Sequence, residues 1–132
     1  MPITKRAARQ QIINAYVDIS YADLTSGAAA DAIQLPPNAV VISGFVQTTA
    51  AFNSGTSDAL VVGDSVTANR YLTSTSIRTA NAVNALTVTG YQPTTQSHVT
   101  VTWTGAGAAP TAGSLRLYVN YVVIGREQFS QG

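Results

Sequence analysis

Apolar and polar residues alternate along much of this chain, with the period of two that a half-buried β-strand produces. The alternation is clearest over 97–125, where Val99, Val101 and Trp103 share one face and Leu115 to Val123 repeats the pattern. The segment between them, 104–113, holds three glycines and a proline, so we expect neither strand to continue through it. The pattern predicts a hairpin of two long strands in the middle of a sheet, with Trp103 in the core.

Shorter alternating segments precede this pair. The segment 11–21 is rich in β-branched residues after Ile12, which favours a strand over a competing helix at 6–17. The segment 39–49 carries apolar residues on both faces, which is typical of a strand inside a sheet or at a subunit contact. Further short strands are expected at 31–35, 59–62, 70–77 and 85–89, with turns at 36–38, 53–55 and 81–84.

About eight strands in one domain of this size predict an all-β fold, with a jelly-roll-like β-sandwich of antiparallel strands as the first choice. An immunoglobulin-like sandwich is the alternative, since it too places a tryptophan on a central strand. We expect the sandwich to cover 11–126, preceded by a basic N-terminal arm over 1–10 and followed by a C-terminal tail over 127–132.

Charged residues make up only 10% of the chain, so its polar surface must consist mainly of Thr, Ser, Asn and Gln. A surface with so little charge does not keep copies apart, which favours a protein that is assembled with something, with a neutral monomer as the alternative. The net charge of +1 gives no broad field for nucleic acid, and no apolar run approaches the roughly 20 residues that span a bilayer. Neither nucleic acid nor membrane is therefore an expected partner.

Residues for catalysis are sparse. The chain has no cysteine, no G-x-S-x-G motif and one histidine, His98, which the alternation places on the surface. Ser54 lies in an ordinary turn sequence, and Asp58 and Asp64 are expected to cap turns through backbone hydrogen bonds. We expect no enzyme activity, no cofactor and no metal site; a small hydrolase that uses His98 with an acid and a nucleophile is the alternative that remains.

The candidate partner-binding residues lie at the two ends of the chain and on the strand faces opposite the apolar stripes. The arm is basic and is expected to contact an acidic neighbour, while the exposed tyrosines are expected to pack against another subunit. The candidates are Lys5, Arg6, Arg9, Tyr16, Tyr118 and Phe129.

Four parts of the chain have distinctive turn and strand sequences: FNSGTSDALVVGD at 52–64, RYL at 70–72, VTWTGAG at 101–107 with AG at 112–113, and YVVIGR at 121–126. These stretches resemble the small structural proteins of tailed bacteriophages, and the resemblance covers roughly Pro36 to Arg126. The resemblance implies a capsid decoration (cement) protein of jelly-roll type that binds the major capsid protein and ties neighbouring capsomers together. It further implies location on the phage head, with assembly in the host cytoplasm. Self-association as a homodimer or homotrimer, about a twofold or threefold axis, would match the symmetry of such a shell.

A second function remains open beside this one. A tail or fibre module that recognises a host surface glycan would display tyrosines and aspartates on its loops. Only Tyr71, Tyr91 and Asp64 fit that description here.

Overall fold

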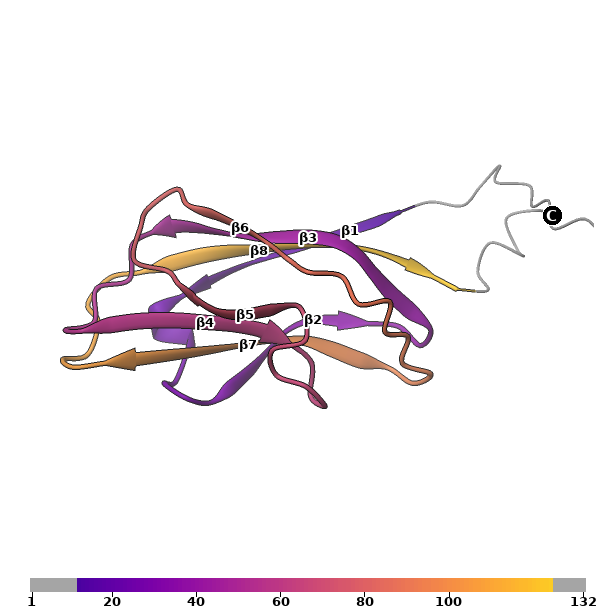
Figure 1. Cartoon of the computed structure of the whole chain (residues 1–132), viewed down its shortest axis with the longest axis horizontal. Helices are drawn as coiled ribbons and strands as arrows, with labels where there is room; N and C mark the ends of the chain where they lie inside the picture. The colour runs from indigo at the N-terminus through magenta and orange to yellow at the C-terminus, as the bar shows by residue number, and fades with distance from the viewer. Residues whose placement is uncertain (1–11, 125–132) are drawn as a thin grey trace, which may run out of the picture.

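The structure is a computed structural model that describes residues 12–124, and it consists of two four-stranded antiparallel sheets packed face to face (Figure 1). One sheet has the order β1-β8-β3-β6 and is called the β8 sheet below; the other has the order β2-β7-β4-β5 and is called the β7 sheet. The strands are β1 (Ile13–Ser20), β2 (Ala29–Leu35), β3 (Ala39–Ala50), β4 (Ser57–Gly63), β5 (Leu72–Ser76), β6 (Val83–Ala85), β7 (Ser97–Ala106) and β8 (Ser114–Val123). A single 3₁₀ turn, η1 (Tyr21–Asp23), follows β1.

The strand pairing is that of a jelly roll. Strand β1 pairs with β8, β2 with β7, β3 with β6 and β4 with β5, so the chain is one long hairpin folded over into a sandwich. Two further pairings, β3 with β8 and β4 with β7, complete the two four-stranded sheets. This confirms the predicted jelly-roll-like sandwich and excludes the seven-stranded immunoglobulin arrangement.

The core lies between the two central strands. Val99, Val101 and Trp103 of β7 face Leu115, Leu117 and Val119 of β8, and all six are buried, with Trp103 only 5% exposed. The alternation therefore predicted both inner faces correctly, including the position of the tryptophan.

The predicted hairpin is wrong, because β7 and β8 lie in different sheets. Each is an inner strand, as expected, but β7 pairs with β2 and β4 while β8 pairs with β1 and β3. The connection of seven residues between Ala106 and Ser114 is longer than tight hairpin loops and crosses from one sheet to the other. Periodicity gives the face of a strand but does not give its partner.

The linking segment expected at 104–113 begins later than predicted, because β7 continues past Thr104 to Ala106. A Cβ atom at Gly105 would lie 2.5 Å from the Trp103 ring and 2.8 Å from the Ser54 hydroxyl oxygen. Glycine is required at this position for close packing rather than for ending the strand.

The predictions for the segment 81–89 need correction as well. The strand is β6, at Val83–Ala85, instead of 85–89, and the turn expected over 81–84 ends before Val83. Asn81 has a φ of 67°, which is a turn conformation. The buried Leu86 still donates its N–H to the Gly44 carbonyl of β3 at 2.9 Å, but the Thr87 N–H donates to the Tyr71 carbonyl, next to β5 of the other sheet, at 2.7 Å. The chain therefore leaves the β8 sheet after Leu86.

The remaining predicted strands are present as β1 to β5, with shifted ends. The described chain begins and ends at the same end of the sandwich, since Ile13 of β1 lies opposite Tyr121 of β8 (Figure 1). The expected arm and tail lie outside the described residues. Within residues 12–124, no helix is long and apolar enough to cross a membrane.

Candidate partner-binding face

The outer face of the β8 sheet carries a row of three aromatic side chains, one from each of three neighbouring strands. Tyr16 of β1 and Phe45 of β3 both lie opposite Tyr118 of β8. The ring centroids of Tyr16 and Tyr118 are 6.0 Å apart, and those of Tyr118 and Phe45 are 4.5 Å apart. Tyr16 is 61% exposed, whereas Tyr118 and Phe45 are half-buried. These three residues are called the aromatic row below.

A row of polar side chains lies beside the aromatic row, toward the end of the sandwich where the described chain begins and ends. The Asn14 side-chain amide donates to Oδ1 of Asn120 at 2.5 Å, and the Asn120 side-chain amide donates to the Ser43 hydroxyl at 2.8 Å. These bonds run across β1, β8 and β3, as cross-strand side-chain pairs do.

A charged pair lies on the other side of the aromatic row. Arg116 of β8 donates to both Asp18 carboxylate oxygens, at 2.6 and 3.4 Å, and to the Tyr118 hydroxyl at 3.3 Å. Its guanidinium also lies 5.7 Å from the centroid of the Tyr16 ring. The hydrogen bond to Asp18, followed by that to Tyr118, raises the pKa of Arg116 further above its usual range. Side-chain contacts therefore link the neighbouring strands of this face, and the charges of Arg116 and Asp18 cancel.

A shallow depression of about 330 Å³ borders this charged pair. Its polar lining includes the Asp18 and Asp23 carboxylates and the Thr49 and Ser114 hydroxyls, which bond each other at 2.6 Å. Asp23 is already engaged, because it accepts the Ser20 N–H at 2.9 Å. No group of three His, Cys, Asp or Glu side chains within residues 12–124 is arranged to hold a metal ion.

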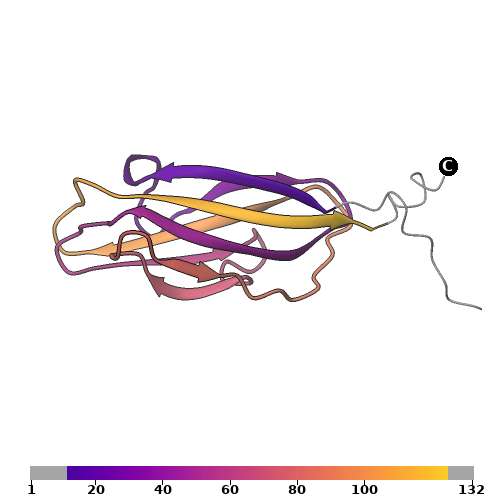
Figure 2. The same ribbon diagram turned by 90° about the horizontal axis from the view of Figure 1, so that it is seen from above.

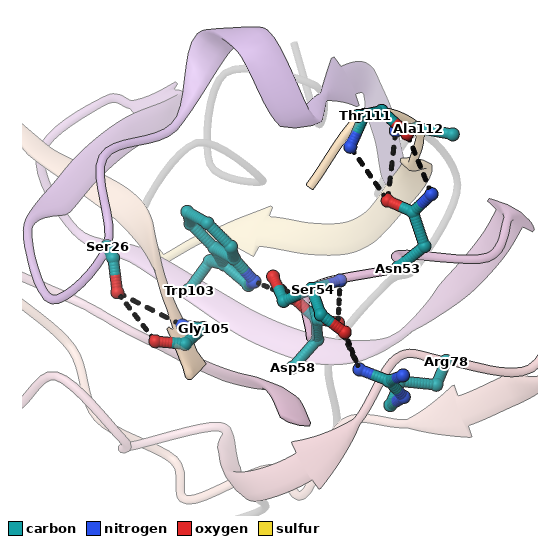
Figure 3. Close-up of polar contacts among 9 residues, drawn as sticks. All are labelled: Ser26, Asn53, Ser54, Asp58, Arg78, Trp103, Gly105, Thr111 and Ala112. Atoms are coloured by element: carbon teal, nitrogen blue, oxygen red, sulfur yellow. Dashed lines mark hydrogen bonds and ion pairs between the residues drawn. The ribbon is translucent and has the colours of Figure 1, made fainter. Parts of the chain in front are cut away.

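A buried polar cluster fastens the loop before β4 to β7 (Figure 3). Asp58 accepts hydrogen bonds from the Ser54 hydroxyl at 2.5 Å, the Ser54 N–H at 3.0 Å, the Arg78 guanidinium at 2.8 Å and the Trp103 indole N–H at 2.9 Å. Asp58 does cap the turn as expected, but it is buried, and Ser54 is more than an ordinary turn residue because its hydroxyl is buried with it.

This cluster does not offer a reachable nucleophile. The Ser54 hydroxyl donates to the Asp58 carboxylate, which also accepts hydrogen bonds from Arg78 and Trp103. Both Ser54 and Asp58 are buried. Asp58 pairs with Gly105, seven residues along β7 from His98, which corresponds to roughly 23 Å. His98 itself is half-buried beside Gln34 of β2, so these three residues form no catalytic triad.

The loop residues suggested for glycan recognition are engaged with one another. Asp64 accepts the N–H groups of Val66 and Thr67, at 3.0 and 2.8 Å, and pairs with Arg70. The Arg70 guanidinium lies 3.6 Å from the centroid of the Tyr91 ring. Tyr71 is buried, and burial, followed by the Asp64 charge, raises the pKa of its hydroxyl.

Of the candidate residues from the sequence, the structure brings Tyr16 and Tyr118 together on one exposed face. Lys5, Arg6, Arg9 and Phe129 lie outside the described residues. Sequence reasoning missed Phe45, Asn14, Asn120 and Arg116. Alternation could have placed Asn14, Asn120 and Arg116 on an outer face, but Phe45 faces outward only because a bulge in β3 reverses the alternation. The four residues come together because β1, β8 and β3 are neighbouring strands (Figure 2).

Chains of three bacteriophage capsid structures share this fold. A chain of the cyanophage Pam1 capsid asymmetric unit matches with a TM-score of 0.70 at 21% identity, covering 93% of this chain and 99% of that one. A chain of the acidic stable capsid structure of Helicobacter pylori bacteriophage KHP30 matches with a TM-score of 0.66 at 15% identity, covering 85% and 87%. A chain of the Ralstonia phage GP4 capsid matches with a TM-score of 0.64 at 18% identity, covering 93% and 90%.

No family model and no curated protein sequence matches the chain. At these identities the structural matches establish the fold alone: this is a jelly-roll sandwich of a kind that occurs as a chain of phage capsids.

Proposed function

We propose that this chain is a structural protein of a bacteriophage virion, a decoration protein that binds the major capsid protein on the head and stabilises the shell. The observation that carries the proposal is the structural match to chains of three phage capsids, which covers most of this chain and most of each capsid chain. What those capsid chains have in common with this one is the whole sandwich and not a fragment of it. Assembly in the host cytoplasm is part of the proposal.

The outer face of the β8 sheet is the proposed contact with the shell. Tyr16 is mostly exposed, and tyrosine is among the residues that contribute most to protein interfaces. Arg116 and Asp18 neutralise each other, so this face would bind by area and shape complementarity more than by charge.

The aromatic row suits a protein partner better than a glycan. Its rings lie against one another, so Tyr118 is covered on both sides, by Tyr16 and by Phe45. A sugar that stacks on an aromatic side chain needs a free ring face. The alternative of a glycan-binding tail module is further weakened because Tyr71 and Asp64 are buried.

Binding to isolated capsid shells tests the proposed face. We expect Tyr16→Ser to weaken binding of the purified chain by on the order of 30-fold, as for loss of an interface tyrosine worth about 2 kcal/mol. Val66→Ser is the matched control, because Val66 is 74% exposed but lies in the loop after β4, in the other sheet. Equal weakening by both variants, or no weakening by Tyr16→Ser, would place the contact elsewhere.

A second experiment tests the function itself. Particles assembled without this chain should lose resistance to heat and osmotic shock, and adding the purified chain should restore it. Unchanged resistance, or absence of the chain from purified particles, would contradict a decoration role.

The basic arm over 1–10 is proposed as a second contact. Residues 12–124 contain three arginines and five aspartates, a formal charge of −2, and each arginine pairs with an aspartate of the same chain. The other four basic residues and the one glutamate lie in the terminal segments, which carry +3. Both segments are attached at the same end of the sandwich, so we propose that this end faces an acidic surface of the shell.

A further inference from the structure

Strand β1 is an unprotected edge of the β8 sheet. It is eight residues long, pairs with β8 along its whole length without a bulge, and has no strand of residues 12–124 on its other side (Figure 2). Natural edge strands are shielded by shortness, bulges, proline or charged side chains, lysine above all. Of the other edge strands in the described chain, β2 has a bulge, β5 has five residues and β6 has three. Strand β1 is longer and has no bulge, lysine or proline, and its one charged side chain, Asp18, is paired with Arg116.

The hydrogen-bonding groups along the free side of β1 can be identified from the register. The Tyr21 N–H donates to the Gly113 carbonyl at 2.9 Å, and these residues continue the register of β1 against β8. Because inward and outward groups alternate along an antiparallel strand, the residues with outward N–H and C=O groups are Asn14, Tyr16, Asp18 and Ser20. Ser20 is already occupied, since its N–H donates to Asp23.

The three residues whose outward backbone groups remain available, Asn14, Tyr16 and Asp18, can pair with the same three residues of a second copy. If two copies of β1 run antiparallel with Tyr16 opposite Tyr16, then Asn14 of each copy lies opposite Asp18 of the other, and each pair can exchange two backbone hydrogen bonds. Apolar residues also meet on the inner face, where Ile13 lies opposite Ile19. If the register of the two β1 strands shifts in one direction, Asp18 of one copy lies opposite Ile12 of the other. If it shifts in the other direction, Asn14 lies opposite Ser20, whose N–H already donates to Asp23.

We propose that two copies of this chain associate through β1, antiparallel about a twofold axis at Tyr16. The two β8 sheets become one eight-stranded sheet, and the two aromatic rows become one row of six rings. The exposed Ile13 side chain, 40% accessible in the monomer, gains a neighbour on the other copy. This inference does not require the proposed capsid role, but such a dimer would present twice the area of the same face to a shell.

Disulfide trapping of the purified full chain tests both the pairing and its register. The chain has no cysteine, so single-cysteine variants can be interpreted without interference. In the proposed dimer the two Tyr16 Cα atoms are about 5.5 Å apart, within disulfide range, so Tyr16→Cys should cross-link under mild oxidation. The two Asp18 positions are offset by four residues, roughly 13 Å, so Asp18→Cys should stay uncross-linked.

The complementary measurement is the oligomeric state by sedimentation equilibrium. We expect a dimer with a dissociation constant on the order of micromolar, as befits a small strand-pairing interface. Asn14→Pro removes only the outward N–H and should raise this constant at least about tenfold above that of Asn14→Ala, which loses the same side chain but keeps the N–H.

A charge exchange gives an independent check of the register. Asn14→Asp places two carboxylates opposite each other and should weaken the dimer, and the double variant Asn14→Asp/Asp18→Asn should recover it. A wild-type monomer at millimolar concentration, a trimer, equal cross-linking of Asp18→Cys, or no difference between Asn14→Pro and Asn14→Ala would each overturn the proposal.

Discussion

Replacing Trp103 by alanine should destabilise the protein by about 3–5 kcal/mol, the usual cost of truncating a buried tryptophan or phenylalanine. The Trp103 side chain is almost fully buried, and its ring centroid lies 6.1 Å from that of Phe52 in the core. Truncation leaves a cavity there and removes the indole N–H that donates to Asp58 at 2.9 Å. Since domains of this size are typically stable by about 5–15 kcal/mol, the loss is a large share of the total.

Trp103→Phe separates the hydrogen bond from the packing. Phenylalanine keeps much of the apolar volume but has no N–H, and Asp58 still accepts bonds from Ser54 and Arg78. We therefore expect a smaller loss, about 1–2 kcal/mol. Urea unfolding followed by circular dichroism suits all three proteins, because Trp103 is the only tryptophan and its fluorescence disappears in both variants.

Two results would refute this reasoning. A loss below about 1 kcal/mol for Trp103→Ala would mean that the ring is not a core residue. Equal losses for the alanine and phenylalanine variants would mean that the hydrogen bond to Asp58, and not the packing, accounts for the whole effect.

Three further predictions concern stability and assembly. Thr48→Val should raise the free energy of unfolding by roughly 1 kcal/mol, because the Thr48 hydroxyl is buried with no hydrogen-bond partner among the described residues; a loss on urea unfolding would contradict this. The raised pKa of Tyr71 stabilises the fold below the ordinary tyrosine pKa of 10.0, and that contribution is lost as the pH rises through the folded-state pKa. Tyr71→Phe should therefore lose less stability than the wild type on alkaline titration, and parallel curves would argue against the shift. Deleting residues 1–10 should weaken binding to shells and reduce its dependence on salt; if the deletion variant binds as tightly as the full chain at both low and high salt, the arm makes no charged contact.

The alternation of residues was enough to predict which side chains are buried in the longest strands. In β8 the inner face of Leu115, Leu117 and Val119 could be predicted, because every second residue is apolar and the strand has no bulge against β1. The exposure of Tyr16 followed from the same rule applied to β1. The all-β class and the eight-stranded sandwich follow from such segments and from the turns between them.

Pairing between distant strands could not be predicted in this way. The separation of β7 and β8 into different sheets depends on β1 and β4, which are far away in the sequence. In β3 the pairing with β8 shifts between Val41 and Ser43, and this bulge reverses the phase of the alternation so that Phe45 faces outward. The aromatic row depends on both effects, so its third member could not be found from local patterns.

The buried polar cluster around Asp58 could not be predicted from the sequence either. Asp58 is adjacent in sequence to small and apolar residues, and only the fold brings the Trp103 indole and the Arg78 guanidinium to its carboxylate (Figure 3). A buried carboxylate with four donors satisfies the requirement that buried charge be paired, but the donors come from three separate segments.

A cryo-electron microscopy reconstruction of shells incubated with the purified chain tests the account most directly. We predict sandwich-shaped density on the outer surface of the shell at symmetry-related positions, with Tyr16 and Tyr118 at the contact. The end of the sandwich where the described chain begins and ends should lie close to an acidic surface of the shell. Shells without added density, or density in which the β7 sheet faces the shell, would contradict it.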